Sequence, residues 1–265
     1  MRRVSKQLRF EVYKTMKQPD KYVHGMDWGK DVFSFNDMRN YRQYQYDLIG
    51  RYIGTNILEV GSGDKSFTQQ LLCKNKNIKN LFSIEPSRTL YETHYSNLHF
   101  PDFVNFECID LFDLNISKTG IFDTVILIHV LEHIEHDKAA LDYLYSFVSP
   151  GGYVLIEVPA MPFLYSNHDK MLGHYRRYNK KTLLSKIDTQ KFEITKLWYQ
   201  DPIGVFGSWY FFKMRKIILK SEEGLNFVKN NGGIYDKYVI PFEKQVERLV
   251  TFPFGLSLTA ILKRR

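Results

Sequence analysis

The sequence predicts an α/β fold built on a doubly wound parallel sheet, on the strength of two observations. Short apolar runs of strand length alternate with helix-length segments from residue 56 to residue 158. This alternation is typical of a parallel sheet with helices on both faces. The first apolar run breaks at Gly61 and Gly63, which lets bare backbone approach a ligand. With 265 residues and 44% hydrophobic content, the chain can bury one large core with appendages.

The elements follow from periodicity and from helix-breaking residues. A helix is expected over 36–53, because aromatic and apolar residues recur there at three- and four-residue spacing until Gly54. Further helices are expected over 66–74, 87–96, 137–147 and 181–187, and strands over 56–60, 81–84, 104–109, 123–128, 153–158 and 192–199. Ser149 to Gly152 is interpreted as the break before the fifth strand, since proline ends the helix and paired glycines permit a tight reversal.

The composition indicates which kind of binding partner and which cellular compartment are expected. Lys and Arg number 37 against 29 for Asp and Glu, a net charge of +8, which favours an anionic partner or is simply a basic surface. Cys73 and Cys108 are too few for a disulfide scaffold, and we expect both to be small core residues. The start of the chain lacks the apolar run of a secretory signal, and no segment is apolar enough to span a bilayer. A cytoplasmic protein is therefore expected.

The glycine turn indicates a cofactor that has a ribose but no diphosphate. Glu85 ends a second apolar strand about twenty residues after the glycines, where an acid would meet a ribose hydroxyl pair. Lys65 and Ser66 occupy the two positions where a dinucleotide loop would place its third glycine. No glycine-lysine-serine/threonine sequence follows, so a P-loop is excluded.

Five segments in order resemble the class I S-adenosylmethionine-dependent methyltransferases, over roughly residues 36–160. They are Leu58 to Gly63, Glu85, Glu107 to Asp110, Phe122 to Ile134, and Val148 to Leu155. The resemblance implies a Rossmann-like sheet of seven strands whose last strand, at 254–262, is antiparallel. It also implies S-adenosyl-L-methionine as the cofactor. The departure is Lys65, where many members have glycine, and this affects the expected loop conformation.

The resemblance also divides the chain. Residues 1–35 are expected to form an N-terminal extension and 36–265 the methyltransferase domain, with a substrate loop at 160–180 and a helical insertion or cap at 202–250. The expected cofactor-binding residues are Glu59, Gly61, Ser62, Gly63, Glu85, Pro86, Asp110, Leu111 and His129.

Histidines cluster near two strand exits, and His129, His168 and His174 are the candidate catalytic residues. Histidine titrates near neutrality and can accept a hydroxyl proton. The alternative is that His129 and its neighbours only hydrogen-bond to loops. His129, Glu132 and His133 also resemble the glutamate, glutamate, histidine pattern of some metal-dependent members. Because histidine replaces the first glutamate, we expect no metal, with Glu132 and His133 as the less favoured ligands.

The loop at 164–178 supplies the candidate acceptor-binding residues, Asp169, Tyr175, Arg176 and Arg177. Arginines can clamp phosphate or carboxylate, and tyrosines can stack on a sugar or a base. Alternatively, the arginines fasten the loop to the domain. His168 and Asp169 are a candidate orienting pair.

The segment 203–220 is apolar and aromatic, then cationic. As one helix it would align Lys213, Lys216 and Lys220 along one side, the pattern of a peripheral membrane helix. A helix that caps the core or makes a dimer contact is the favoured alternative. The oligomeric state is left open.

These residues predict a methyltransferase acting on an oxygen of a small molecule, sugar or lipid-linked glycan. One alternative is an RNA or protein methyltransferase that uses the basic surface, but no nucleic-acid module is evident and no DNA partner is expected. Another is a non-catalytic scaffold that binds the cofactor.

Overall fold

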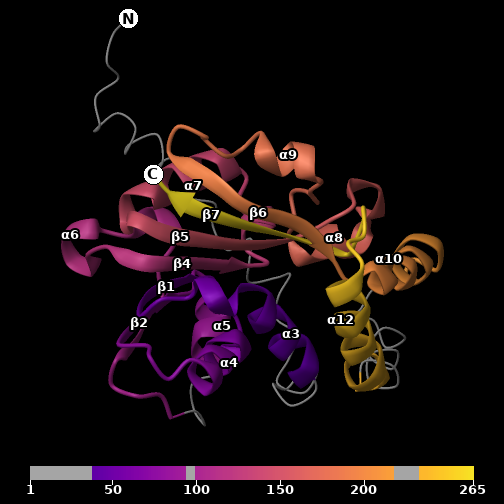
Figure 1. Cartoon of the computed structure of the whole chain (residues 1–265), viewed down its shortest axis with the longest axis horizontal. Coiled ribbons are helices and arrows are strands. Elements are labelled where there is room, and N and C mark those ends of the chain that lie inside the picture. The colour runs from indigo at the N-terminus through magenta and orange to yellow at the C-terminus, as the bar shows by residue number, and fades with distance from the viewer. Residues whose placement is uncertain (1–37, 94–98, 218–232) are drawn as a thin grey trace, which may run out of the picture.

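The computed structural model describes residues 38–93, 99–217 and 233–265 (Figure 1). Within these ranges seven strands form one sheet, in the order β3-β2-β1-β4-β5-β7-β6. The expected N-terminal extension at 1–35 lies outside the described residues, as do residues 218–220.

The strand directions confirm a Rossmann-like sheet with an antiparallel last strand. β7 pairs antiparallel with both β5 and β6, whereas β1 to β5 pair in parallel among themselves. The strands are β1 (Asn56–Val60), β2 (Asn80–Ile84), β3 (Val104–Glu107), β4 (Phe122–Ile128), β5 (Val148–Pro159), β6 (Phe192–Gln200) and β7 (Ser257–Arg264). The strand order reverses beside β1, which lies between β2 and β4. Open sheets bind ligands at the carboxyl ends of the strands at such a point.

Helices cover both faces of the sheet. Figure 1 shows α3, α4 and α5 on one side of the sheet and α7 and α9 on the other, with α10 and α12 beside one end. The helices are α3 (Arg39–Ile49), α4 (Ser66–Lys74), α5 (Arg88–Thr93), α6 (Ile116–Thr119), α7 (Asp137–Leu144), α8 (Asn167–Leu172), α9 (Lys180–Leu184), α10 (Pro202–Ser208) and α12 (Ile240–Leu249). No helix in the described ranges is both long and apolar enough to cross a membrane.

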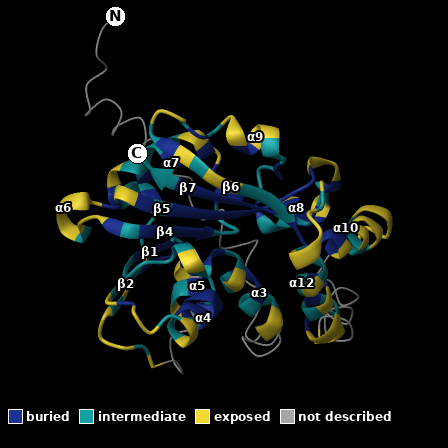
Figure 2. Cartoon of the chain, viewed as in Figure 1, coloured by how far each residue is buried: buried dark blue, intermediate teal, exposed yellow. Residues whose placement is uncertain are grey.

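Alternate residues of each central strand face opposite cores. Ile57 packs with Phe67 and Leu71 of α4, whereas Leu58 packs in the cluster that contains Leu141 and Leu144 of α7. The central strands β4, β5 and β7 are accordingly the most buried part of the molecule (Figure 2). Burial on both faces explains why these strands are nearly continuous apolar runs rather than alternating ones.

Two expectations from the sequence are wrong, one about the start of β5 and one about the burial of the cysteines. Ser149 to Gly152 does not precede the fifth strand but lies inside β5, where a register shift against β4 and the positive φ of Gly151 (75°) absorb the glycines. Cys73 and Cys108 are both exposed. Cys73 lies on the outward face of α4, and Cys108 follows the end of the edge strand β3, which is shorter than predicted.

The segment after β6 is a cap rather than one long helix. α10 continues into a π-helical turn over Trp209–Met214, and Lys216 has φ 55°, which ends the helix. Lys213 Nζ donates to the carbonyl of Tyr165 at 2.8 Å, so this cation fastens the cap to the substrate loop. The regular helix that would align Lys213 with Lys216 ends before Lys216, and Lys220 lies outside the described residues.

The cap also fixes the start of α3. Asp236, in the π-helical turn Tyr235–Val239, accepts hydrogen bonds from the backbone amides of Asn40 and Tyr41 at 3.0 and 2.7 Å. These are two of the amides that a helix leaves without an internal partner at its N-terminus. The contact places Tyr41 beside the carboxyl ends of β4 and β5.

Candidate functional site

The loop after β1 exposes its backbone. Gly61 and Gly63 have φ values of 74° and 51°, in the left-handed region that favours glycine. The amides of Gly61 and Ser62 both donate to the carbonyl of Ile84, which ties the loop to the end of β2. A Cβ at Gly61 would lie 2.5 Å from Val130 Cγ2, whereas a Cβ at Gly63 would meet nothing within 4 Å. The loop is thus a close-fitting cradle at Gly61 and open at Gly63.

Glu85 lies directly against this cradle. Its carboxylate accepts hydrogen bonds from the amide of Gly63 at 2.8 Å and from the amide of Ser87 at 2.9 Å. Burial raises the pKa of Glu85 above its ordinary value. The predicted ribose-binding acid is therefore fixed in orientation before any ligand arrives, with Pro86 half-buried next to it.

Two other predicted cofactor residues have clear local roles. Glu59 is buried and accepts hydrogen bonds from the hydroxyls of Thr68 and Ser83 at 2.7 and 2.8 Å, so it joins β1 to α4 and β2. Asp110 accepts from the amide of Phe112 at 2.9 Å and caps the turn that begins at the buried Leu111. Direct contact of either acid with the cofactor stays a prediction.

Lys65 keeps the loop conformation that a glycine would favour. It has φ 62° and is fully buried. Its Nζ donates to the carbonyl of Tyr91 at 3.0 Å and lies over the rings of Tyr91 and Phe106. Burial lowers the pKa of Lys65. The substitution is accommodated by burying the lysine side chain rather than by reshaping the loop.

His129 begins the turn that follows β4. Its φ of 53° is unusual for a residue other than glycine, and such strain is concentrated at functional sites. Nε2 lies 3.1 Å from Glu157 Oε1, and Nδ1 lies 3.4 Å from Glu132 Oε1. Burial alone would lower the pKa of His129, but the two carboxylates raise it to about 9. The two carboxylates therefore favour the protonated form of the His129 ring.

Asp169 organises the substrate loop. It closes a capping box with Ser166 at the start of α8. Its Oδ1 lies 3.0 Å from His174 Nδ1 and 2.7 Å from Arg177 Nε. Burial would raise the pKa of Asp169, but His174 and Arg177 hold it well below its usual range. The carboxylate thus orients His174 through one ring nitrogen.

A cavity of about 280 Å³ opens where β4 and β5 end. It brings together all three predicted catalytic histidines, from two segments of the chain, the turn after β4 and the loop at 164–178. The lining residues are Tyr41, His129, Glu132, His133, Pro159, His168, Leu172, His174, Arg177, Ser208, Phe212, Leu256 and Ser257.

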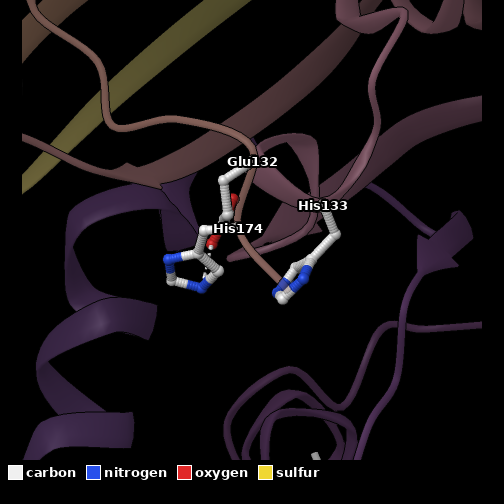
Figure 3. Close-up of side chains that lie close together, drawn as sticks. All are labelled: Glu132, His133 and His174. Atoms are coloured by element: carbon white, nitrogen blue, oxygen red, sulfur yellow. Dashed lines mark ion pairs between the residues drawn. The ribbon is translucent and has the colours of Figure 1, made fainter. Parts of the chain in front are cut away.

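The histidines in this cavity differ in charge. Burial lowers the pKa of His133 and of His168 to about 4, so both are neutral at pH 7. The His168 ring stacks on Phe212 of the cap, with centroids 4.3 Å apart and planes 14° apart. His133 and His174 meet edge to face at 4.7 Å, beside the carboxylate of Glu132 (Figure 3).

The predicted acceptor-binding residues separate into lining and fastening groups. Arg177 lines the cavity. Asp169 is fully buried in its own ion pairs, and it pairs with His174 rather than with His168 as predicted. Arg176 donates to the carbonyls of Ile134 and Glu135 and pairs with Asp137 at 2.7 Å. The fastening alternative, which concerned the two arginines, therefore describes Arg176.

Tyr175 also belongs to the fastening group. Its amide donates to the carbonyl of Glu132 at 2.8 Å, and its ring lies beneath the guanidinium of Arg176. This backbone hydrogen bond joins the substrate loop to the turn after β4 and brings His174 close to Glu132.

Three further residues at or beside the cavity were not expected from the sequence: Tyr41, Glu157 and Phe212. Glu157 is a fully buried acid inside an apolar strand, and this isolated charge was a usable signal. It accepts a hydrogen bond from Gln45 at 2.9 Å and lies 3.4 Å from the hydroxyl of Tyr41. Tyr41 and Phe212 carried no such signal, because helix and cap packing alone bring them to the cavity.

The fold and this site define a class I methyltransferase. A family model described as a methyltransferase domain matches residues 33–198. The chain belongs to this methyltransferase family.

Individual relatives agree with the family. The chain is 23% identical over 130 residues to a ubiquinone biosynthesis O-methyltransferase of Chromobacterium violaceum, covering 48% of this chain and 55% of the relative. The aligned region therefore spans about half the length of that relative.

Solved structures show the same fold. One is the N-methyltransferase NodS of Bradyrhizobium japonicum WM9 with S-adenosyl-L-homocysteine, at a TM-score of 0.53, 12% identity, and coverage of 97% of this chain and 98% of that one. Another is the plantazolicin methyltransferase BpumL with a desmethyl substrate analogue and S-adenosyl-L-homocysteine, at a TM-score of 0.56, 14% identity, and coverage of 97% and 95%.

The cofactor of this protein is S-adenosylmethionine. The site fits that group, because the left-handed cradle at Gly61 excludes a Cβ and Glu85 is held beside the open backbone at Gly63. These residues would hold the cofactor at the point where the strand order reverses.

Proposed function

We propose that this methyltransferase acts on a hydroxyl oxygen of a small molecule, a sugar or a lipid-linked glycan. The proposal is supported mainly by three histidines, His129, His168 and His174, that line the cavity where β4 and β5 end. Methyl transfer to a hydroxyl oxygen requires removal of the hydroxyl proton, which a histidine can accept. The curated relative is likewise named as an O-methyltransferase.

The chain's own residues divide the remaining work. When bound, S-adenosylmethionine supplies a methyl group on a sulfonium sulfur, which leaves as a neutral thioether once the acceptor oxygen takes the methyl group. His168 lines the cavity in its neutral form and is the proposed acceptor of the hydroxyl proton, although burial makes it a weaker base than a solvent-exposed histidine. Phe212 stacks on His168 and helps to keep water away from that ring.

The test is a survey of acceptors with the full-length protein. Release of S-adenosylhomocysteine is measured with phenols, sugars, lipid-linked glycans, amines and RNA. We expect turnover with a hydroxyl compound, and loss of that turnover in His168→Ala with cofactor affinity intact. His136→Ala is the matched control, because His136 is exposed and outside the cavity.

Two outcomes would contradict the proposal. Turnover confined to amines would assign the enzyme to nitrogen acceptors. Cofactor binding with no turnover across all acceptor classes would favour the scaffold alternative. Salt-sensitive turnover of RNA would instead favour the nucleic-acid alternative.

A further inference from the structure

Three side chains that offer metal-ligand atoms meet at one wall of the cavity (Figure 3). Glu132 and His133 come from the turn after β4, and His174 comes from the substrate loop. One ligand atom from each lies within 4.8 Å of the others. Side chains from two separate segments thus point at a common position.

The burial of the Glu132 carboxylate is energetically unfavourable in this environment. The residue is fully buried, and neither carboxylate oxygen accepts a hydrogen bond from a described residue. Its Oε1 lies 3.4 Å from His129 Nδ1. Glu132 shares the His129 ring with the equally buried Glu157, so one imidazolium faces two carboxylates and a further cation would complete the charge balance.

His174 is oriented toward Glu132 by its partner. Ionised Asp169 can only accept, so the His174 Nδ1 that lies 3.0 Å from it carries a hydrogen. Nε2 then faces Glu132 Oε1 at 3.9 Å, which is beyond hydrogen-bond distance. A carboxylate that holds one histidine nitrogen while the other nitrogen faces a further ligand is the usual support of a metal-binding histidine.

We propose that Glu132, His133 and His174 form a binding site for one divalent transition-metal ion. Two imidazoles and one carboxylate suit Zn²⁺, Mn²⁺, Fe²⁺ or Co²⁺, whereas Mg²⁺ and Ca²⁺ prefer oxygen ligands. This inference differs from the expectation from sequence, which did not foresee that His174 would join Glu132 and His133.

The metal site would add a metal ion to the proposed methyl transfer. Its catalytic role rests on the proposed function. Three protein ligands leave coordination positions open, and all three ligand residues line the cavity. A bound metal would offer such a position to an acceptor oxygen and would lower the pKa of its hydroxyl group. His168, which is not a ligand of this site, would accept the proton as in the proposed function.

The experiment measures metal binding directly. Full-length protein is freed of metal with a chelator, dialysed, and titrated with Co²⁺ while the visible absorption is recorded. We expect saturation at one ion per chain and displacement by Zn²⁺. Glu132→Gln and His174→Ala should lose the signal, Asp169→Asn should weaken binding about 10–100-fold, and His136→Ala should bind as the wild type does.

Cofactor affinity separates the two proposals. Calorimetry with S-adenosylhomocysteine shows whether each variant keeps a folded cofactor site. If His174→Ala does not fold, the result for Glu132→Gln, which conserves the side-chain shape, is used instead. Absence of Co²⁺ and Zn²⁺ binding by the wild type would overturn the metal site, as would undiminished binding in folded Glu132→Gln. In either case methyl transfer to a hydroxyl would leave the proposed function standing.

Discussion

Replacing Gly61 with alanine should selectively damage cofactor binding. Alanine at φ 74° adds about 1–2 kcal/mol of backbone strain. The new Cβ would lie 2.5 Å from Val130 Cγ2, and such overpacking adds about 1–3 kcal/mol. In the free protein the loop can move and so avoid both the backbone strain and the clash with Val130. Cofactor binding requires the original loop conformation, so both costs then reduce the binding free energy. The sum of about 2–5 kcal/mol corresponds to an affinity loss of roughly 30-fold to several thousand-fold.

Two further variants separate strain from the steric clash. Val130→Ala in the Gly61→Ala background removes the methyl group that the Cβ meets and should recover about 1–3 kcal/mol of binding free energy. Gly120 has φ 77° and nothing within 4 Å of its Cβ position, far from the site. Gly120→Ala should therefore lower stability without changing affinity.

The assay is calorimetry with S-adenosylhomocysteine, with thermal unfolding to verify that each variant is folded. Unchanged affinity in a folded Gly61→Ala variant would refute the assignment of this loop as the cofactor cradle. Equal affinity in the single and double variants would refute the role of Val130.

Three other changes give independent predictions. Burial and the neighbouring Asp201 raise the pKa of Glu243 from 4.5 to about 9, so the folded protein keeps a proton that the unfolded chain releases near pH 4.5. Stability measured in urea should fall from about pH 5 to pH 9, by up to about 1.4 kcal/mol per pH unit, and Glu243→Gln should flatten this slope. Arg176→Ala should lower the unfolding free energy by about 1.5–3 kcal/mol, because its contacts to Asp137 and two carbonyls are lost, with cofactor affinity unchanged. Exposed Phe206 and Met214 should support co-sedimentation with anionic vesicles, which serine at both positions should abolish.

Each of these has a contrary result. A rise in stability between pH 5 and pH 9 would show that Glu243 is ionised in the folded protein. Unchanged stability of Arg176→Ala together with a raised KM for an anionic acceptor would restore the clamp hypothesis for Arg176. Vesicle binding that survives both serine substitutions would place any membrane contact elsewhere.

Much of the fold was predictable because it depends on local patterns. The buried strands are apolar runs of the right length, and their limits follow from glycines and capping residues such as Asp110. The errors fall where tertiary context overrides local preference. A proline and two glycines are absorbed inside β5 because β4 pairs across them with a shifted register, and Cys73 faces outward because the opposite side of α4 packs on the sheet.

The site was predictable only in part, for a physical reason. His129, Glu132 and His133 are neighbours in sequence, so their shared strand exit could be foreseen. The position of His174 depends on its distant partners: Asp169 fixes its ring, and the Tyr175 amide ties the loop to the carbonyl of Glu132. These contacts convert a histidine that sequence offered as a base into one that faces a buried carboxylate. The proposed metal site and the predicted acceptor-binding residues share the loop at 164–178, so changes there should alter metal affinity and acceptor choice together.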